Sequence, residues 1–474
     1  MIFYRIHAHC LFVGGITALA MRTRKNLHGM VGAAVLITAQ ALLLKDVQPA
    51  ASWFYYFAWW PYILIIDSLV YRIRGNSLLM NRRGEFAVLS LWSVVIWTLF
   101  EAINLVMQNW YYVNVIPLRS IRWPGYAIAY ATVLPGLFET VELLESLGLF
   151  KGARVKPVIV GRSAALGMFS SGVACAGAVL LFPAYCYPLM WGAFILMLEP
   201  INHHWGAKSL LRDWEQGTLR TLCLLLSAGL VCGMLWEFWN FWAATKWVYT
   251  VPFFEKLKLF EMPLLGFLGF PPFTVECYCL YNFISLFRHQ RSWEQDSYGL
   301  NRRKKVHFAL IVLTVAAGFI FCGITFNAMD AATVNSYWST ISDLESIPPA
   351  AARRLSDVGI VTPQNLLSET SSRPRREAMA NLLGVPPDDL LRWIKSAELA
   401  ALKGMGARNA NLLMSAGIHD IISLARQDAE LLHQNLARNH QIAPGKHPSP
   451  PRPAILRIWI REAKQHRTVA DEET

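Results

Sequence analysis

The stretches Glu101-Ala102-Ile103-Asn104 and Glu237-Phe238-Trp239-Asn240 are two copies of one pattern, and both lie inside long apolar runs. Thr140-Val141-Glu142 recurs in the same way as Thr274-Val275-Glu276. A charge at the centre of a bilayer costs at least about 2.5–3.5 kcal/mol, so an acid there is a functional-site hypothesis by default. Acids at duplicated positions predict one ancestral site that is used twice.

A third acid extends the duplication. The run from Trp59 to Asp67 aligns with the run from Trp191 to Glu199, and Ser77-Leu78-Leu79 then aligns with Ser209-Leu210-Leu211. Residues three apart share a helix face, so each Glu and the Asn that follows it face the same neighbour. We therefore expect each copy to bring three acids together.

The composition favours a membrane protein. The chain has a mean hydropathy of +0.32, with 54% hydrophobic and 16% charged residues, which excludes an ordinary soluble globular class. About 20 apolar residues of helix span the hydrocarbon core. We predict ten spans: 4–21, 28–44, 52–71, 86–107, 125–149, 163–183, 185–201, 221–244, 262–287 and 306–326.

The spans predict an all-α polytopic membrane protein with two parallel four-helix repeats and a C-terminal helical domain. Four spans per repeat give both repeats the same orientation. Alternate short loops hold 20 and 6 basic residues, which places both termini outside and predicts a bacterial inner-membrane protein with a periplasmic C-terminal domain. The predicted parts are a lone span at 1–27, the repeats at 28–150 and 151–288, a loop and final span at 289–330, and the domain at 342–467.

The C-terminal stretch carries a duplicated turn. Leu402-Lys403-Gly404-Met405-Gly406 leads to Gly417-Ile418, and an earlier copy ends in Gly359-Ile360. With Trp393 and Trp459, this stretch resembles a bacterial helix-hairpin-helix domain family of unknown function. In hairpin proteins the glycine-turn amides can hold a DNA phosphate, here with Lys403 and Arg408. Since this stretch is nearly neutral, we expect protein docking rather than nucleic-acid binding.

Neither the cysteines nor the histidines predict a metal site or a cofactor. All eight Cys lie in apolar segments without CxxC spacing, which indicates neither a disulfide framework nor a zinc site. A metal enzyme built on Glu, Asn and His203 is the weakest alternative, because the chain lacks repeated histidine boxes.

One further resemblance concerns chemistry. Trp236-Glu237, Trp247-Val248-Tyr249, Pro271-Pro272 and Glu276 resemble the membrane-embedded lycopene cyclases of the heterodimeric type, although this chain has Glu where that family usually has Asp. The resemblance implies acid chemistry on an isoprenoid-like molecule between the two repeats.

Three functions stay open: conversion or binding of an apolar lipid or isoprenoid, proton- or cation-coupled transport, and a non-catalytic scaffold with a docking domain. A buried Glu acts as a general acid in the first and as an ion site in the second. Any single acid can instead be structural, hydrogen-bonded to a Trp N–H or an Arg. The predicted catalytic residues are Glu237, Glu276, Glu101 and Glu142. The predicted substrate-binding residues are Asn240, Asn104, Trp236, Trp239, Trp247, Asp67, Glu199 and His203.

Overall fold

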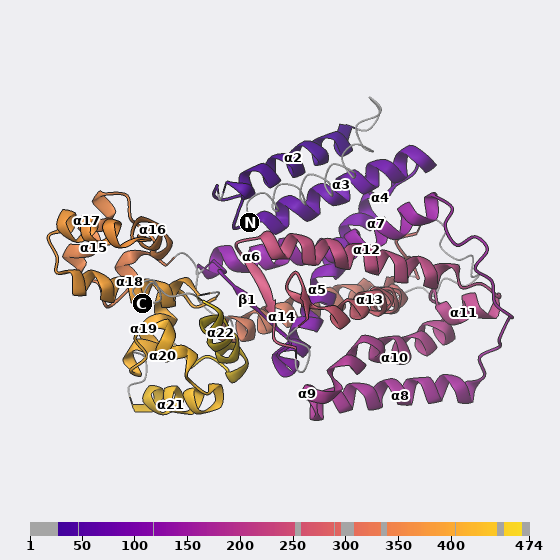
Figure 1. The fold of residues 1–474 in the computed structure, drawn as a ribbon. Coiled ribbons are helices and arrows are strands. Elements are labelled where there is room, and N and C mark those ends of the chain that lie inside the picture. Colours follow the sequence, from indigo (N-terminus) through magenta and orange to yellow (C-terminus); the bar gives the residue numbers. More distant parts are fainter. Residues whose placement is uncertain are drawn as a thin grey trace. The chain divides into compact units, whose positions relative to one another are not determined.

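The computed structural model describes a predominantly helical chain with a few short strands (Figure 1). It divides into two compact units. The first unit holds the long helices, and the second combines residues 110–122 and 246–250 with the chain from 339 to 466. The described residues are 27–45, 47–116, 118–251, 257–288, 290–294, 308–332, 339–402, 404–442 and 450–466. The predicted span at 4–21 lies outside them.

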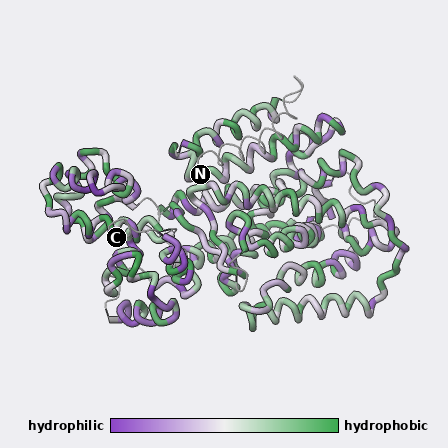
Figure 2. The backbone as a smooth tube through the Cα atoms, viewed as in Figure 1, coloured by the Kyte–Doolittle hydropathy of each residue, from purple (hydrophilic) through white to green (hydrophobic). Residues whose placement is uncertain are grey.

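Eight helices in the described part of the chain are long and apolar enough to cross a membrane. Figure 2 shows hydrophobic residues along these helices and a more mixed pattern in the C-terminal helices. The predicted span at 52–71 forms helix α3 (Phe54–Arg74), which is not among the eight. The eight helices cover Leu27–Leu44, Arg83–Met107, Arg119–Ser146, Arg162–Leu181, Pro183–Trp205, Arg220–Trp242, Leu264–Arg288 and Phe308–Asp330.

The segment 28–150 begins with two closely packed helices. A Cβ added at Gly32 would lie 2.7 Å from the carbonyl oxygen of Pro61, so only glycine lets α2 and α3 approach this closely. Helix α3 ends at Gly75, whose left-handed φ of 70° suits a residue without a Cβ. The elements are α2 (Leu27–Leu44), α3, α4 (Leu78–Asn81), α5 (Arg83–Met107), β1 (Trp110–Val113), α6 (Arg119–Tyr130) and α7 (Val133–Ser146).

The segment 151–288 repeats this order. A Cβ added at Gly172 would lie 2.8 Å from the carbonyl oxygen of Ala193, so its first two long helices also meet at a glycine. The elements are α8 (Arg162–Leu181), α9 (Pro183–Cys186), η1 (Tyr187–Leu189), α10 (Met190–Trp205), α11 (Leu210–Glu215), α12 (Arg220–Trp242), β2 (Lys246–Tyr249), β3 (Lys258–Leu259), β4 (Met262–Pro263), η2 (Leu264–Gly269), α13 (Phe270–Ser285) and η3 (Leu286–Arg288). Helix α14 (Phe308–Ala332) follows and packs on α5, where a Cβ at Gly318 would meet Val95.

Strands β1 and β2 pair with each other as an antiparallel ribbon. Trp110 pairs with Tyr249, and Val113 pairs with Lys246. When Glu101 is aligned with Glu237, Trp110 corresponds to Lys246 and Val113 to Tyr249. Each strand therefore meets its own counterpart in a self-complementary register, as a two-fold axis would generate.

The C-terminal helices contain one turn twice. The N–H of Ile360 donates to the carbonyl of Leu355, and the N–H of Ile418 donates to that of Leu413. Gly359 and Gly417, each with a φ of 85°, end the helices before these turns. The elements are η4 (Ile341–Asp343), α15 (Pro349–Asp357), α16 (Pro363–Glu369), α17 (Arg373–Leu383), α18 (Pro387–Ala401), α19 (Gly406–Ser415), α20 (Ile421–Ala425), α21 (Ala429–Ile442) and α22 (Pro453–Gln465).

Candidate functional site

Two duplicated acids make the same contacts in their own segments. Asp67 accepts hydrogen bonds from the Ser77 hydroxyl at 2.9 Å and from the Leu79 N–H at 2.8 Å. Glu199 accepts from the Ser209 hydroxyl at 2.8 Å and from the Leu211 N–H at 3.2 Å. Each serine also caps the short helix that follows, α4 or α11. Both acids thus fasten the loop after a long helix.

The third partner of each acid differs. The His28 Nε2 lies 3.0 Å from the Asp67 Oδ2, whereas the Cys279 thiol lies 3.3 Å from the Glu199 Oε1. An imidazole can carry a positive charge and a thiol cannot. The first segment therefore pairs this acid with a basic side chain, where the second pairs it with a thiol.

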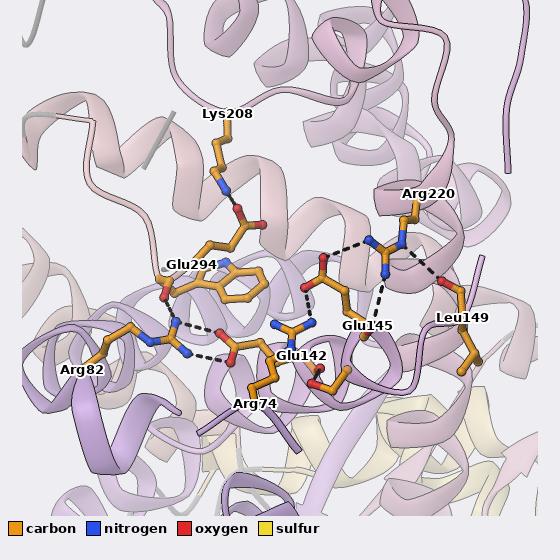
Figure 3. Close-up of polar contacts among 10 residues, drawn as sticks. Arg74, Arg82, Glu142, Glu145, Leu149, Lys208, Arg220 and Glu294 are labelled. Atoms are coloured by element: carbon orange, nitrogen blue, oxygen red, sulfur yellow. Dashed lines mark hydrogen bonds and ion pairs between the residues drawn. The ribbon is translucent and has the colours of Figure 1, made fainter. Parts of the chain in front are cut away.

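Glu142 is held by an arginine. Two nitrogens of Arg82 donate to the two oxygens of Glu142 at 2.8 and 2.7 Å, and Arg82 also donates to the carbonyl of Trp293 (Figure 3). Both side chains are largely buried. This bidentate geometry is the strong form of a carboxylate–guanidinium pair. This is the contact expected of a structural acid that is paired with a loop arginine.

A second ion-pair group lies beside the first in Figure 3. Glu145 lies 2.8 Å from the Arg74 guanidinium and 3.4 Å from that of Arg220, so the group joins α3, α7 and α12. Lys208 pairs with Glu294 close by. The basic loop residues, which the sequence analysis read as topology signals, thus act as partners for acids.

Glu276, the counterpart of Glu142, has no such cation as a hydrogen-bond partner among the described residues. It is fully buried on α13, and its Oε1 accepts the N–H of Phe194 at 3.1 Å. Its Oε2 has no hydrogen-bond partner among the described residues. A buried polar atom without a partner costs about 1–3 kcal/mol, more for a charged group, and calls for an explanation.

Glu139 is a further buried acid, present in the first segment only. No hydrogen bond of normal length reaches either of its oxygens within the described residues. Asp67, Glu142 and Arg82 all interact with it electrostatically. Glu139 therefore interacts with two further acids, one on α3 and one on α7, and with one arginine.

Glu101 does not join that cluster. Arg82, which holds Glu142, directly precedes α5, whereas Glu101 lies nineteen residues further along the chain, about 28 Å at 1.5 Å per residue. The expected meeting of Asp67, Glu101 and Glu142 is therefore not found, because a shared helix face does not bring residues to the same height. Glu101 instead accepts the Trp97 indole N–H at 2.9 Å.

The Asn residues of the duplicated pattern are buried in both segments. Asn104 accepts the backbone N–H of Asn109 at 2.9 Å, which fixes the chain just after α5 ends. Asn240 and Glu237 are buried at the matching end of α12. In each segment the Glu and the Asn of the pattern thus lie in the last two turns of their helix.

Aromatic side chains from both segments meet between the helices. The Trp59 ring centroid lies 5.0 Å from that of Trp236, and the Trp191 centroid lies 5.9 Å from that of Phe100. Trp59 aligns with Trp191, and Phe100 with Trp236, so these are two copies of one contact. Trp239 joins through Trp59 at 5.1 Å, and its indole N–H, like that of Trp59, has no partner in the described chain. Phe273, one turn before Glu276, contacts Phe100 at 5.2 Å.

Two further predicted binding residues have polar partners of their own. His203 is 2.9 Å from the Glu215 carboxylate, and this hydrogen bond holds the pKa of Glu215 below its usual value. Trp247 belongs to strand β2 in the second compact unit, and its indole donates to the Tyr249 hydroxyl at 2.8 Å. In the described part of the chain, no group of three or more His, Cys, Asp or Glu residues has the arrangement to hold a metal ion.

Three residues that contact the predicted acids were not predicted from the sequence: Arg82, His28 and Cys279. Arg82 follows Ser77 by five residues, while Trp214 stands at the corresponding place after Ser209. That unmatched basic residue was the available signal for an ion pair in the first segment alone.

Residues 345–466 match a family described as "Domain of unknown function (DUF4332)". This confirms the prediction of a C-terminal domain of unknown function. No curated protein and no solved structure matches the chain.

Proposed function

We propose that the chain is a bacterial inner-membrane protein in which the segments 28–150 and 151–288 are tandem repeats in one orientation. The matched bonds of Asp67 and Glu199 support this, as do the duplicated aromatic contact and the self-complementary ribbon. Repeats of four spans each would be related by an axis along the membrane normal.

The repeat interface binds an apolar lipid or isoprenoid, and Glu276 acts on it as a general acid or base. The observation that carries this is the unpartnered Oε2 of Glu276 in a fully buried position. Phe273 places the aromatic interface one helical turn away, and aromatic side chains are the usual lining of sites for apolar ligands. Glu237, Asn240 and Trp236 belong to the same end of α12 and would orient the molecule.

The test is co-purification from detergent with lipid analysis by mass spectrometry. The wild-type protein should retain an apolar lipid or isoprenoid that Glu276→Gln loses while staying folded, because Gln keeps the acceptor for Phe194 but cannot titrate. Glu215→Gln is the matched control, since Glu215 lies outside the long helices and contacts His203. A wild-type protein without bound lipid would contradict the proposal.

Proton-coupled transport is the second candidate, and the cluster on α3 and α7 favours it. His28 contacts Asp67, and Asp67 interacts with Glu139, which gives a series of titratable groups through the first repeat. Such series carry protons in membrane pumps and transporters. In reconstituted vesicles, a pH gradient should then drive uptake of the transported substrate by the wild-type protein, and Glu139→Gln should abolish this uptake. Unchanged uptake would remove this candidate.

The C-terminal domain is placed in the periplasm in this proposal. Strands β1 and β2 share a compact unit with it, so the loops that carry them lie on the domain's side of the membrane. Those are the loops poor in basic residues. Alkaline phosphatase fused to the C-terminus should be active. An inactive fusion, with a fluorescent green fluorescent protein fusion, would place the domain in the cytoplasm.

A further inference from the structure

The ribbon of β1 and β2 contributes to the hydrophobic core of the C-terminal domain. Tyr111, Val113 and Val248 are buried in one cluster with core residues of that domain, including Leu402 and Met405. Side chains alternate along a strand, so Tyr111 and Val113 share one face. Val248 pairs with Tyr111 and lies on the same face. One face of the ribbon, made from both strands, is therefore packed against the domain.

The turn between α18 and α19 makes the closest contact. A Cβ added at Gly404 would lie 2.6 Å from the Val113 Cγ1 and 3.6 Å from the Tyr111 ring. Real Cβ atoms do not approach side chains this closely, so glycine is required for the domain to fit against β1. Gly404 also has a φ of 72°, in the left-handed region.

A backbone amide beside the same turn is hydrogen-bonded within the chain. The N–H of Ala407, at the start of α19, donates to the Ser339 hydroxyl at 2.7 Å. In DNA-binding hairpins the corresponding amides face a phosphate. Lys403 lies outside the described residues. The glycine turn of this domain thus has an intramolecular use, which is to receive the ribbon and the chain that enters the domain.

We propose that the C-terminal domain is an intramolecular clamp that holds β1 and β2 in register and thereby couples the two segments. Strand β1 begins three residues after α5 ends, and β2 begins four residues after α12 ends. An isolated two-stranded ribbon is marginally stable in water, so packing against the domain supplies the stability that the ribbon lacks. Loosening the domain should therefore free both strands together.

The test is hydrogen exchange of the full-length protein in detergent, comparing Gly404→Ala with Gly417→Ala. Both glycines have left-handed φ values, but a Cβ at Gly417 meets nothing within 4 Å, so the pair isolates the contact with Val113. Gly404→Ala should speed exchange in 110–113 and in 246–249 by about tenfold or more, as overpacking and local opening imply. Gly417→Ala should leave both strands unchanged.

A compensating change decides whether the contact itself is responsible. Val113→Ala removes the Cγ1 that a new Cβ at position 404 would strike, so Gly404→Ala combined with Val113→Ala should restore slow exchange in both strands. If Gly404→Ala does not fold, Val248→Ala tests the clamp from the other strand and should speed exchange in 110–113 as well. Faster exchange in one strand alone, or equal effects of the two glycine variants, would overturn the proposal.

Discussion

The segments 28–150 and 151–288 bury acids at the same positions but satisfy them differently. In the first, Asp67 has His28 beside it and Glu142 has Arg82, so these two acids each have a basic partner. In the second, the hydrogen-bond partners of Glu199 and Glu276 among the described residues are hydroxyl, thiol and backbone N–H groups. The guanidinium of Arg82 stabilises the charged form of Glu142, whereas the hydrogen-bond donor of Glu276 is a neutral backbone N–H. This contrast is the reason why the proposed acid–base role is given to Glu276 and not to Glu142.

If the two segments are tandem repeats, as proposed, this difference is where the two copies have diverged. The contacts that are identical in both copies, those of Ser77 and Ser209, fasten loops and serve folding in each. The contacts that differ involve residues without a counterpart, such as Arg82, whose aligned position in the second segment is occupied by Trp214. The matched contacts thus stabilise the same loop in both segments, and the unmatched contacts distinguish one segment from the other.

The largest expected effect comes from breaking the ion pair. Glu142→Gln leaves Arg82 largely buried without its carboxylate, which should cost on the order of 3 kcal/mol of unfolding free energy. Glu276→Gln should cost far less, because the amide oxygen still accepts from Phe194. Denaturant unfolding in detergent measures both. Glu142→Gln combined with Arg82→Met should recover most of the loss, and equal losses in the two single variants would erase the contrast.

The matched caps should give equal, intermediate effects. Ser77→Ala and Ser209→Ala each remove a helix cap and one hydrogen bond to a buried acid, so each should cost about 1 kcal/mol. Their values should agree within about 0.5 kcal/mol, because the contacts are copies of each other. The same unfolding experiment measures them. A loss at one serine only would show that the two loops are not equivalent.

The sequence predicted the helical class, the duplicated order of elements and the buried acids, because apolar runs and repeated motifs are local signals. It did not predict the pairing of β1 with β2, since strands far apart in sequence carry no local sign of their partner. For the same reason the place of Trp247 in this ribbon was not predicted. Helical spacing likewise gave the face of Glu101 but not its distance from Glu142.

The smallest expected effect concerns a pair that only the second segment contains. His203 stands where the first segment has Tyr71, and it holds the pKa of Glu215 below its usual value by a hydrogen bond. A carboxyl whose pKa is lower in the folded state contributes stability above its ordinary pKa. That contribution is lost as the pH falls through the carboxyl range, from about 5 to 3.

The pair is partly exposed, so the contribution should be a few tenths of a kcal/mol and weaker in high salt. Unfolding midpoints measured across that range should therefore fall slightly less steeply in Glu215→Gln than in the wild-type protein. His203→Gln should flatten the curve in the same way, because it removes the group that lowers the pKa. If the unfolding midpoints of both variants fell with pH as steeply as those of the wild-type protein, the pair would not form in solution. The contrast between the segments would then rest on the buried acids alone.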